Sequence, residues 1–185
     1  MPEIEPESVP ADIILAEVTR GAYKLAVQIL KQPEDAEDVL QEAAAVAASH
    51  ANAPRPENEN YRSWFFKVVR NKAIDRLRQI NRQKLEALDE STLQSAMQQE
   101  PAARLEQHRL EQRVKIALDC LPVTQREIVL LRDYHGFAYG EIAEILNIPT
   151  GSVMSRLHRA RLALRELLGA TETSGVREEK VERVQ

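Results

Sequence analysis

The chain of 185 residues is poor in cysteine, glycine and aromatic residues, and each shortage excludes a class of protein. Its one cysteine, Cys120, excludes an internal disulfide framework and fits a reducing cytoplasm. Six glycines and 4% aromatic residues are too few for a β-sandwich or for an α/β fold with glycine-rich turns, but this composition suits helices. No apolar run of about 18 residues is present, and the acidic N-terminus lacks a signal-peptide pattern, so we expect no membrane insertion.

Charge is distributed unevenly along the chain, although the net charge is only −4. Residues 62–84 hold eight basic side chains and one acid, and residues 151–165 hold four arginines and no acid. The stretch between them, residues 85–112, has an excess of acids. A single charge run is explained equally well by a solvated helix face, but two basic islands on patterned segments favour contact with nucleic acid.

Apolar residues recur at helical spacing along most of the chain, which predicts an all-α fold. Residues 83–100 are polar and rich in glutamine with no sustained period, which is typical of a linker. We therefore expect two small helical domains joined by a flexible linker. The expected divisions are a disordered acidic N-terminus over 1–11, an N-terminal domain over 12–84, a linker over 85–104, a C-terminal domain over 105–168 and a flexible tail over 169–185.

Residues 141–161 are the most informative segment and predict a helix-turn-helix. Asn147 tolerates the left-handed backbone of the turn, and Val153, Leu157 and Ala160 would form the buried stripe of the second helix. The opposite face would enter the DNA major groove, where serine and arginine side chains can bond base edges. The residues expected on or beside this DNA-binding face are Thr150, Ser152, Met154, Ser155, Arg156, His158 and Arg159.

Four sequence blocks, in this order, resemble the extracytoplasmic-function (ECF) sigma factors of bacterial RNA polymerase. They lie at residues 33–43, 61–76 and 121–132 and in the helix-turn-helix, and the resemblance extends over residues 12–168. It implies a cytoplasmic initiation factor with no catalysis of its own. Such a factor binds core polymerase, recognises the −10 and −35 promoter elements and helps to open the DNA.

The resemblance also implies a role for each block. The second helix would dock on the clamp helices of the largest polymerase subunit. The third helix and the loop before it (residues 52–60) would read the −10 element and trap an unstacked base. The helix-turn-helix would read the −35 element and rest on the flap of the second-largest subunit. The polymerase-binding positions are Asp35, Asp38, Gln41 and Glu42, and the −10 positions are Asn58, Asn60, Tyr61, Trp64, Lys67, Arg70, Asn71, Lys72 and Arg76.

The chain departs from the family pattern at three places. Residues 43–48 are mostly alanine where aromatic and basic residues are usual, and Met154 stands where Lys or Arg is common. Ala138 replaces the usual Ser or Thr at a helix N-cap. Because the family is commonly held by anti-sigma proteins, an anti-sigma factor is an expected partner. Cys120 is expected to be a core residue rather than a redox switch.

Two other functions fit the sequence less well than a sigma factor does. An autonomous dimeric helix-turn-helix regulator explains the C-terminal basic island but neither the island at 62–84 nor the acidic second helix. An enzyme is a poor third, since the sequence has no glycine-rich phosphate loop, no His/Cys metal spacing and no nucleophile elbow. We accordingly expect no metal and no cofactor.

Overall fold

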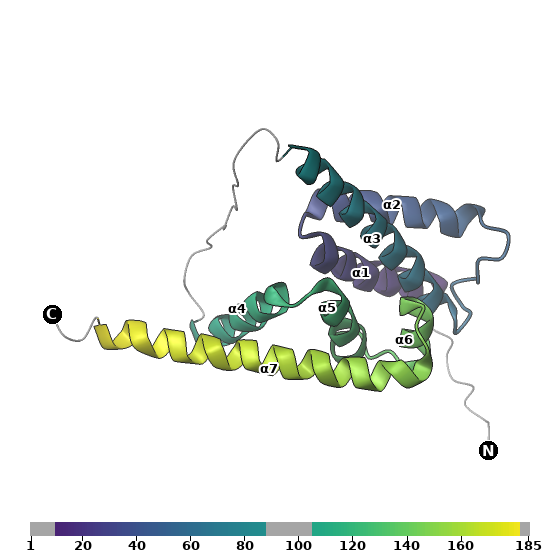
Figure 1. Ribbon diagram of the computed structural model, residues 1–185. Coiled ribbons are helices and arrows are strands. Elements are labelled where there is room, and N and C mark those ends of the chain that lie inside the picture. The colour runs from purple at the N-terminus through teal and green to yellow at the C-terminus, as the bar shows by residue number, and fades with distance from the viewer. Residues whose placement is uncertain (1–9, 88–104, 182–185) are drawn as a thin grey trace, which may run out of the picture.

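The computed structural model describes residues 10–87 and 105–181, and within these ranges every regular element is a helix (Figure 1). The predicted all-α fold is confirmed. The segment expected to be disordered lies almost wholly outside the described residues, as does most of the expected linker. The elements are α1 (Ala11–Leu30), α2 (Pro33–Ser49), α3 (Tyr61–Ala87), α4 (Leu105–Cys120), α5 (Val123–Val129), a π-helical turn η1 (Leu130–Tyr134), α6 (Tyr139–Leu146) and α7 (Thr150–Val181).

α1 and α2 are joined by a tight corner at Lys31. This residue adopts the left-handed conformation (φ 63°), and its backbone N–H donates to the Val27 carbonyl, which ends α1. Pro33 then occupies the first turn of α2, where its missing N–H costs nothing. Ala22 and Ala26 of α1 and the alanines of α2 at the interface are fully buried, and side chains this small let neighbouring helices approach closely.

α3 packs against both α1 and α2 and completes a three-helix unit (α1–α3). Its apolar stripe forms the buried side, because Phe65, Phe66, Val69 and Ala73 are all at most 2% exposed. The approach to α1 is close at Gly21, where a Cβ would lie 2.9 Å from the Phe66 ring. Glycine at this position lets the aromatic ring pack directly on the α1 backbone.

The C-terminal unit (α4–α7) is built along the long helix α7, which contacts α4, α5 and α6 (Figure 1). Gly136, just after η1, adopts the left-handed conformation (φ 73°) that ends the helical turn. The turn of the helix-turn-helix is confirmed as well: Asn147 has φ 53°, and Val153, Leu157 and Ala160 of α7 are buried.

The two units share one hydrophobic core. α6 packs on α3, and buried residues of α5, η1 and α6 continue the cluster formed by α1–α3. At the junction, the fully buried ring of Phe137 meets Phe66 edge-on, with centroids 4.8 Å apart. The chain therefore folds back so that its C-terminal unit covers one side of α3.

Three details differ from the expectations. α3 continues to Ala87, into the expected linker, because residues 77–87 contain no glycine or proline and are rich in good helix formers. The tail expected to be flexible is helical as far as Val181, since no proline interrupts α7. Cys120 is exposed rather than buried, because it lies at the end of α4, outside the buried stripe that contains Ala117.

Candidate nucleic-acid and polymerase interface

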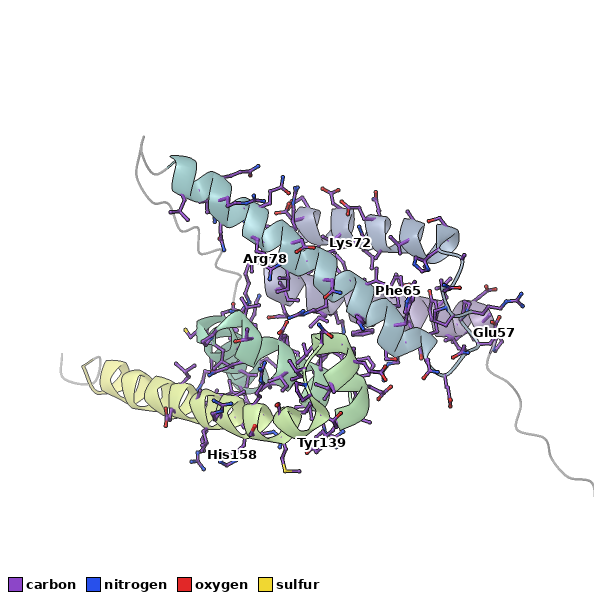
Figure 2. The ribbon with its side chains drawn as sticks, turned by 45° about the vertical axis from the view of Figure 1, so that its right-hand side comes forward. Glu57, Phe65, Lys72, Arg78, Tyr139 and His158 are labelled. Carbon is purple, nitrogen blue, oxygen red and sulfur yellow. The ribbon has the colours of Figure 1, made fainter. Side chains whose placement is uncertain are left out.

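The outward face of α7 carries the side chains that the sequence assigned to DNA. Of the seven, six are exposed and one, Ser152, is partly buried. Figure 2 shows His158 on the side of α7 that faces away from the other helices. Because the helix packs through its opposite stripe, this face is free to enter a groove.

Two contacts order the polar groups on this face. The Ser155 hydroxyl donates to the Ser152 carbonyl at 3.1 Å, and the Arg159 Nε donates to the Ser155 carbonyl at 3.4 Å. The rest of the Arg159 guanidinium extends along the exposed surface, so its remaining N–H groups can meet a base edge or a phosphate. Arg161, on one flank, is instead paired with Asp133, and this hydrogen bond raises the pKa of Arg161.

The helix-turn-helix is held by residues that the sequence analysis did not single out. The Glu141 carboxylate accepts a hydrogen bond from the Ala138 N–H at 2.7 Å, which supports the start of α6 although alanine cannot cap it. Arg132 donates to the Phe137 carbonyl at 2.8 Å and lies over the Tyr139 ring. The role of Glu141 could have been predicted from the sequence, because an acidic residue at the third position of a helix often bonds the N-cap backbone. No neighbouring residue indicates the role of Arg132.

The basic side of α3 that faces α2 is neutralised by the acidic residues assigned to polymerase. Arg76 Nε donates a hydrogen bond to Asp35 Oδ1 at 2.8 Å, and a terminal nitrogen of the same guanidinium lies 2.7 Å from that oxygen in an ion pair. This pairing raises the pKa of Arg76. Lys72 pairs with Glu42 at 2.8 Å (Figure 2 labels Lys72). The −10 set and the polymerase set therefore meet along one groove of about 500 Å³ between α2 and α3. Its lining consists of Asp38, Val39, Gln41, Glu42, Lys72, Asp75, Arg76, Gln79 and Arg82.

The other −10 residues of α3 have different surroundings. The Arg70 guanidinium binds the Glu127 carboxylate of α5 with two hydrogen bonds of 2.9 Å, and it also donates to the Asn71 side chain at 3.3 Å. Asn71 is exposed, and Lys67 and Trp64 are partly buried. Asn71 is therefore the exposed member of this group, whereas the Arg70 guanidinium is occupied by Glu127.

Tyr61 is the one member of the −10 set that belongs to the core. Its side chain is 3% exposed, and its ring stacks on Phe65 with centroids 5.7 Å apart. Burial also raises the pKa of its hydroxyl. The first turn of α3 points Tyr61 inward, so its side chain cannot contact DNA in this conformation.

The loop before α3 is shaped by its asparagines. The Asn58 side chain accepts a hydrogen bond from the Asn60 N–H at 2.8 Å, and both residues are exposed. One side of the loop borders a cavity of about 460 Å³ that also reaches Arg62, Phe66 and His135. Burial, with Arg62 and Lys24 nearby, lowers the pKa of His135 to about 4, so this imidazole is neutral at pH 7.

Within the described ranges, no group of His, Cys, Asp and Glu side chains could hold a metal ion. Among the same residues, no helix is long and apolar enough to cross a bilayer. What the surface offers is two basic faces, on α3 and α7, and an acidic face on α2.

Comparisons with known proteins match both halves of the chain. Sigma-70 region 2 matches residues 15–83, and sigma-70 region 4 matches residues 112–164. RNA polymerase sigma factor SigV of Bacillus subtilis is 33% identical over 143 residues, which are 77% of this chain and 81% of the relative. ECF RNA polymerase sigma factor EcfG of Rhodopseudomonas palustris is 31% identical over 88% of this chain and 86% of its own length.

Solved structures agree with the sequence relatives. The sigma factor RpoE in its complex with the anti-sigma factor NepR from Bartonella quintana has a TM-score of 0.68 and 26% identity; the match covers 85% of this chain and 96% of that one. CnrH, in complex with the cytosolic domain of CnrY, has the same fold (TM-score 0.60, 24% identity, 86% and 88% covered). With its two sigma-70 regions in this order, the chain belongs to the ECF sigma factors of RNA polymerase.

Proposed function

We propose that this sigma factor works through three surfaces. The polar face of α2 formed by Asp35, Asp38, Gln41 and Glu42 binds the clamp helices of the largest polymerase subunit. α3 and the loop before it read and open the −10 element, and the outward face of α7 reads the −35 element while its unit rests on the flap of the second-largest subunit. The chain does no chemistry of its own and acts in the cytoplasm, where the polymerase is.

The observation that carries this proposal is the separation of the two basic faces. They lie on different units, and each is backed by an apolar stripe that keeps its polar side outward. A protein that reads two DNA elements needs two such faces, whereas an autonomous helix-turn-helix dimer needs only the one on α7. The acids on α2 add a third surface of opposite charge, which suits a protein partner better than DNA.

Transcription with purified components tests the proposal. The chain is mixed with core polymerase that lacks any sigma factor, fragmented DNA from the source genome is added, and the transcripts are sequenced. Discrete start sites that share two upstream motifs are the expected result. No specific initiation, combined with tight binding of duplex DNA by the chain alone, would instead establish the autonomous regulator.

An anti-sigma factor completes the proposed function. The RpoE structure contains such a partner, and this chain exposes the acidic face of α2 that polymerase would need. A protein covering that face would compete with polymerase by mass action. Purification of the tagged chain from native cells should return one small partner besides the polymerase subunits. Repeated recovery of polymerase subunits alone would count against it.

A further inference from the structure

Met154 is a large apolar side chain on the otherwise polar outward face of α7. It is 64% exposed, whereas Val153, Leu157 and Ala160, which attach α7 to its unit, are at most 2% exposed. The other six side chains assigned to this face are polar or charged. Met154 therefore lies outside the core of the C-terminal unit, at a position where solvent alone would favour a polar residue.

Met154 lies near the start of α7, the part of a recognition helix that contacts base edges. It is the fifth residue of the helix, which begins at Thr150. The turn before the helix is fixed by the left-handed backbone of Asn147 and by a hydrogen bond of 3.0 Å from the Ile148 N–H to the Ala143 carbonyl. When α7 enters the major groove, this geometry places the side chain of Met154 among base edges.

A basic residue on the same flank of α7 can hold that flank against the DNA backbone. Arg161 follows Met154 by seven residues, so it lies on the same side of the helix, about 10 Å further along. The Asp133 carboxylate accepts hydrogen bonds from Nε and one terminal nitrogen of Arg161. This pair leaves the other terminal nitrogen for a phosphate. The flank therefore offers a cation to the backbone and, nearer the start of the helix, an apolar tip to the bases.

A thioether can recognise only one feature of the base edges in the major groove. It carries no N–H or O–H donor, and its sulfur is a weak acceptor, so it gains little from the polar atoms of guanine, adenine or cytosine. The C5 methyl group of thymine is the apolar feature of that groove, and apolar side chains contact it. Methionine is long and unbranched, so its tip can adapt to the position of the methyl group.

We propose that Met154 determines the base at one position of the −35 element by packing against the C5 methyl group of a thymine. This contact replaces the one made by the Lys or Arg that is common in the family at this position. It therefore makes the −35 preference of this chain differ from that of relatives with a basic residue there. The inference rests on the proposed function, because Met154 meets a thymine only if α7 reads the −35 element.

Removing the methyl group from the DNA tests the contact directly. The promoter recovered in the transcription experiment is prepared with each thymine of its −35 element, on either strand, replaced in turn by deoxyuridine, which lacks only the methyl group. The wild-type chain with core polymerase should initiate about fourfold less at one of these positions, the loss expected for one apolar group of this size. Unchanged initiation with every deoxyuridine, or a −35 element without thymine, would overturn the proposal.

Protein variants identify Met154 as the partner of that methyl group. Met154→Ala should initiate equally well on the thymine and deoxyuridine templates, whereas Met154→Leu should keep the difference between them. Ile116→Ala removes a 52% exposed apolar side chain from α4 and is the matched control, so it should keep the wild-type ratio between the templates. If Met154→Ala lowered initiation but kept that ratio, Met154 would contact the polymerase instead of thymine, and the proposal would fail.

Met154→Lys restores the residue type that is common in the family and should give the opposite result. The variant should lose the difference between thymine and deoxyuridine. It should also bind promoter DNA with a steeper salt dependence, its log–log slope changing by about one for the added phosphate contact, whereas Met154→Leu should keep the wild-type slope. A thymine preference that persisted in Met154→Lys would overturn the proposal.

Failure of the thymine contact is distinct from failure of the sigma function. If the wild-type chain starts no transcripts on the thymine promoter, the proposed function fails and the contact fails with it. If it initiates equally well on the thymine template and on every deoxyuridine template, the proposed function stands and only the role of Met154 is rejected.

Discussion

Asp35 of α2 and Arg76 of α3 form a hydrogen-bonded ion pair, so a residue proposed for polymerase and one proposed for the promoter neutralise each other in the free protein. A variant of Asp35 alone would mix a loss of binding with a loss of this pair. Exchanging the two charges separates the effects.

Asp35→Arg should lower the melting temperature slightly and weaken core-polymerase binding about tenfold. The double variant Asp35→Arg/Arg76→Asp should regain the melting temperature but not the binding, measured by competition for labelled core. If the double variant regained both the melting temperature and the binding of core polymerase, Asp35 would have only a structural role.

Arg159 should determine one position of the −35 preference. Its guanidinium is exposed on the outward face of α7, and a bidentate contact with guanine is worth about 1–3 kcal/mol. Arg159→Ala should therefore weaken −35-dependent transcription and relax the preference at one base, measured on a library of −35 sequences. Arg165→Ala, at an exposed position further along the same helix, is the control. An equal loss on every sequence would show that Arg159 contacts only phosphate.

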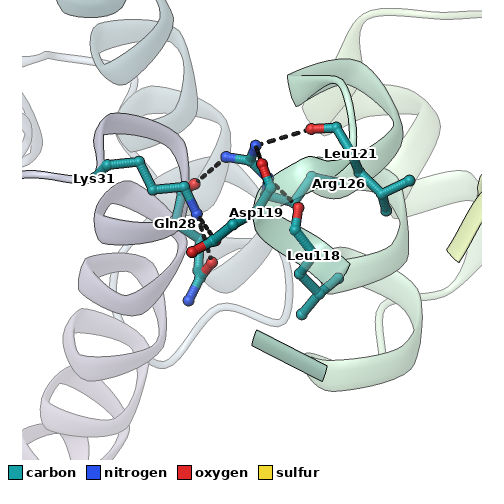
Figure 3. Close-up of polar contacts among 6 residues, drawn as sticks. All are labelled: Gln28, Lys31, Leu118, Asp119, Leu121 and Arg126. Carbon is teal, nitrogen blue, oxygen red and sulfur yellow. Dashed lines mark hydrogen bonds and ion pairs between the residues drawn. The ribbon is translucent and has the colours of Figure 1, made fainter. Parts of the chain in front are cut away.

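Arg126 should matter far more to stability than an exposed arginine. Arg126→Met leaves four backbone carbonyls without their donor (Figure 3), and we expect the free energy of unfolding to fall by about 2–5 kcal/mol in urea. Burial lowers the pKa of Arg126, because it disfavours the charged guanidinium. Arg78→Met breaks an ion pair whose partners are both more than 70% exposed, and it should change stability by less than about 0.5 kcal/mol. Similar losses in the two variants would contradict this account.

His135 should make the folded chain less stable in mild acid. In the unfolded chain the imidazole takes up a proton near pH 6.5, whereas in the folded chain it stays neutral down to about 4. The contribution of His135 is therefore fully present above pH 6.5 and is lost as the pH falls from 6.5 towards 4. Urea titrations across this window should show a shallower dependence for His135→Gln than for wild type. His158→Gln, an exposed control, should keep the wild-type slope.

Local rules predicted the helix-turn-helix well. The buried stripe of α7, the left-handed turn at Asn147 and the exposed positions each depend on a few neighbouring residues, so periodicity and turn chemistry sufficed. Tyr61 shows the limit of this reasoning. An aromatic residue at the start of a basic helix can point to solvent or to the core, and here its packing against Phe65 directs it to the core.

The contact between the units could not be predicted from the sequence. Arg126 and Glu127 are consecutive charged residues, and sequence patterns place such residues at the surface. Arg126 receives one of its four carbonyl partners from α1, and Glu127 receives its guanidinium partner from α3, both from far along the chain. The motif that identified the family included these two residues, but its spacing carries no information about their partners.

The π-helical turn η1 has a consequence for how the C-terminal unit meets the rest of the chain. Its hydrogen bond runs from the His135 N–H to the Leu130 carbonyl, which fits one more residue into the turn than an α-helix holds. One residue corresponds to about 100° of rotation, so this widening sets the direction in which Tyr134 and His135 point. Tyr134 thereby reaches Lys24 and His135 reaches Phe66. Deleting one residue of this turn would rotate Tyr134 and His135 away from Lys24 and Phe66. The extra residue in η1 therefore determines which surfaces of the two units meet.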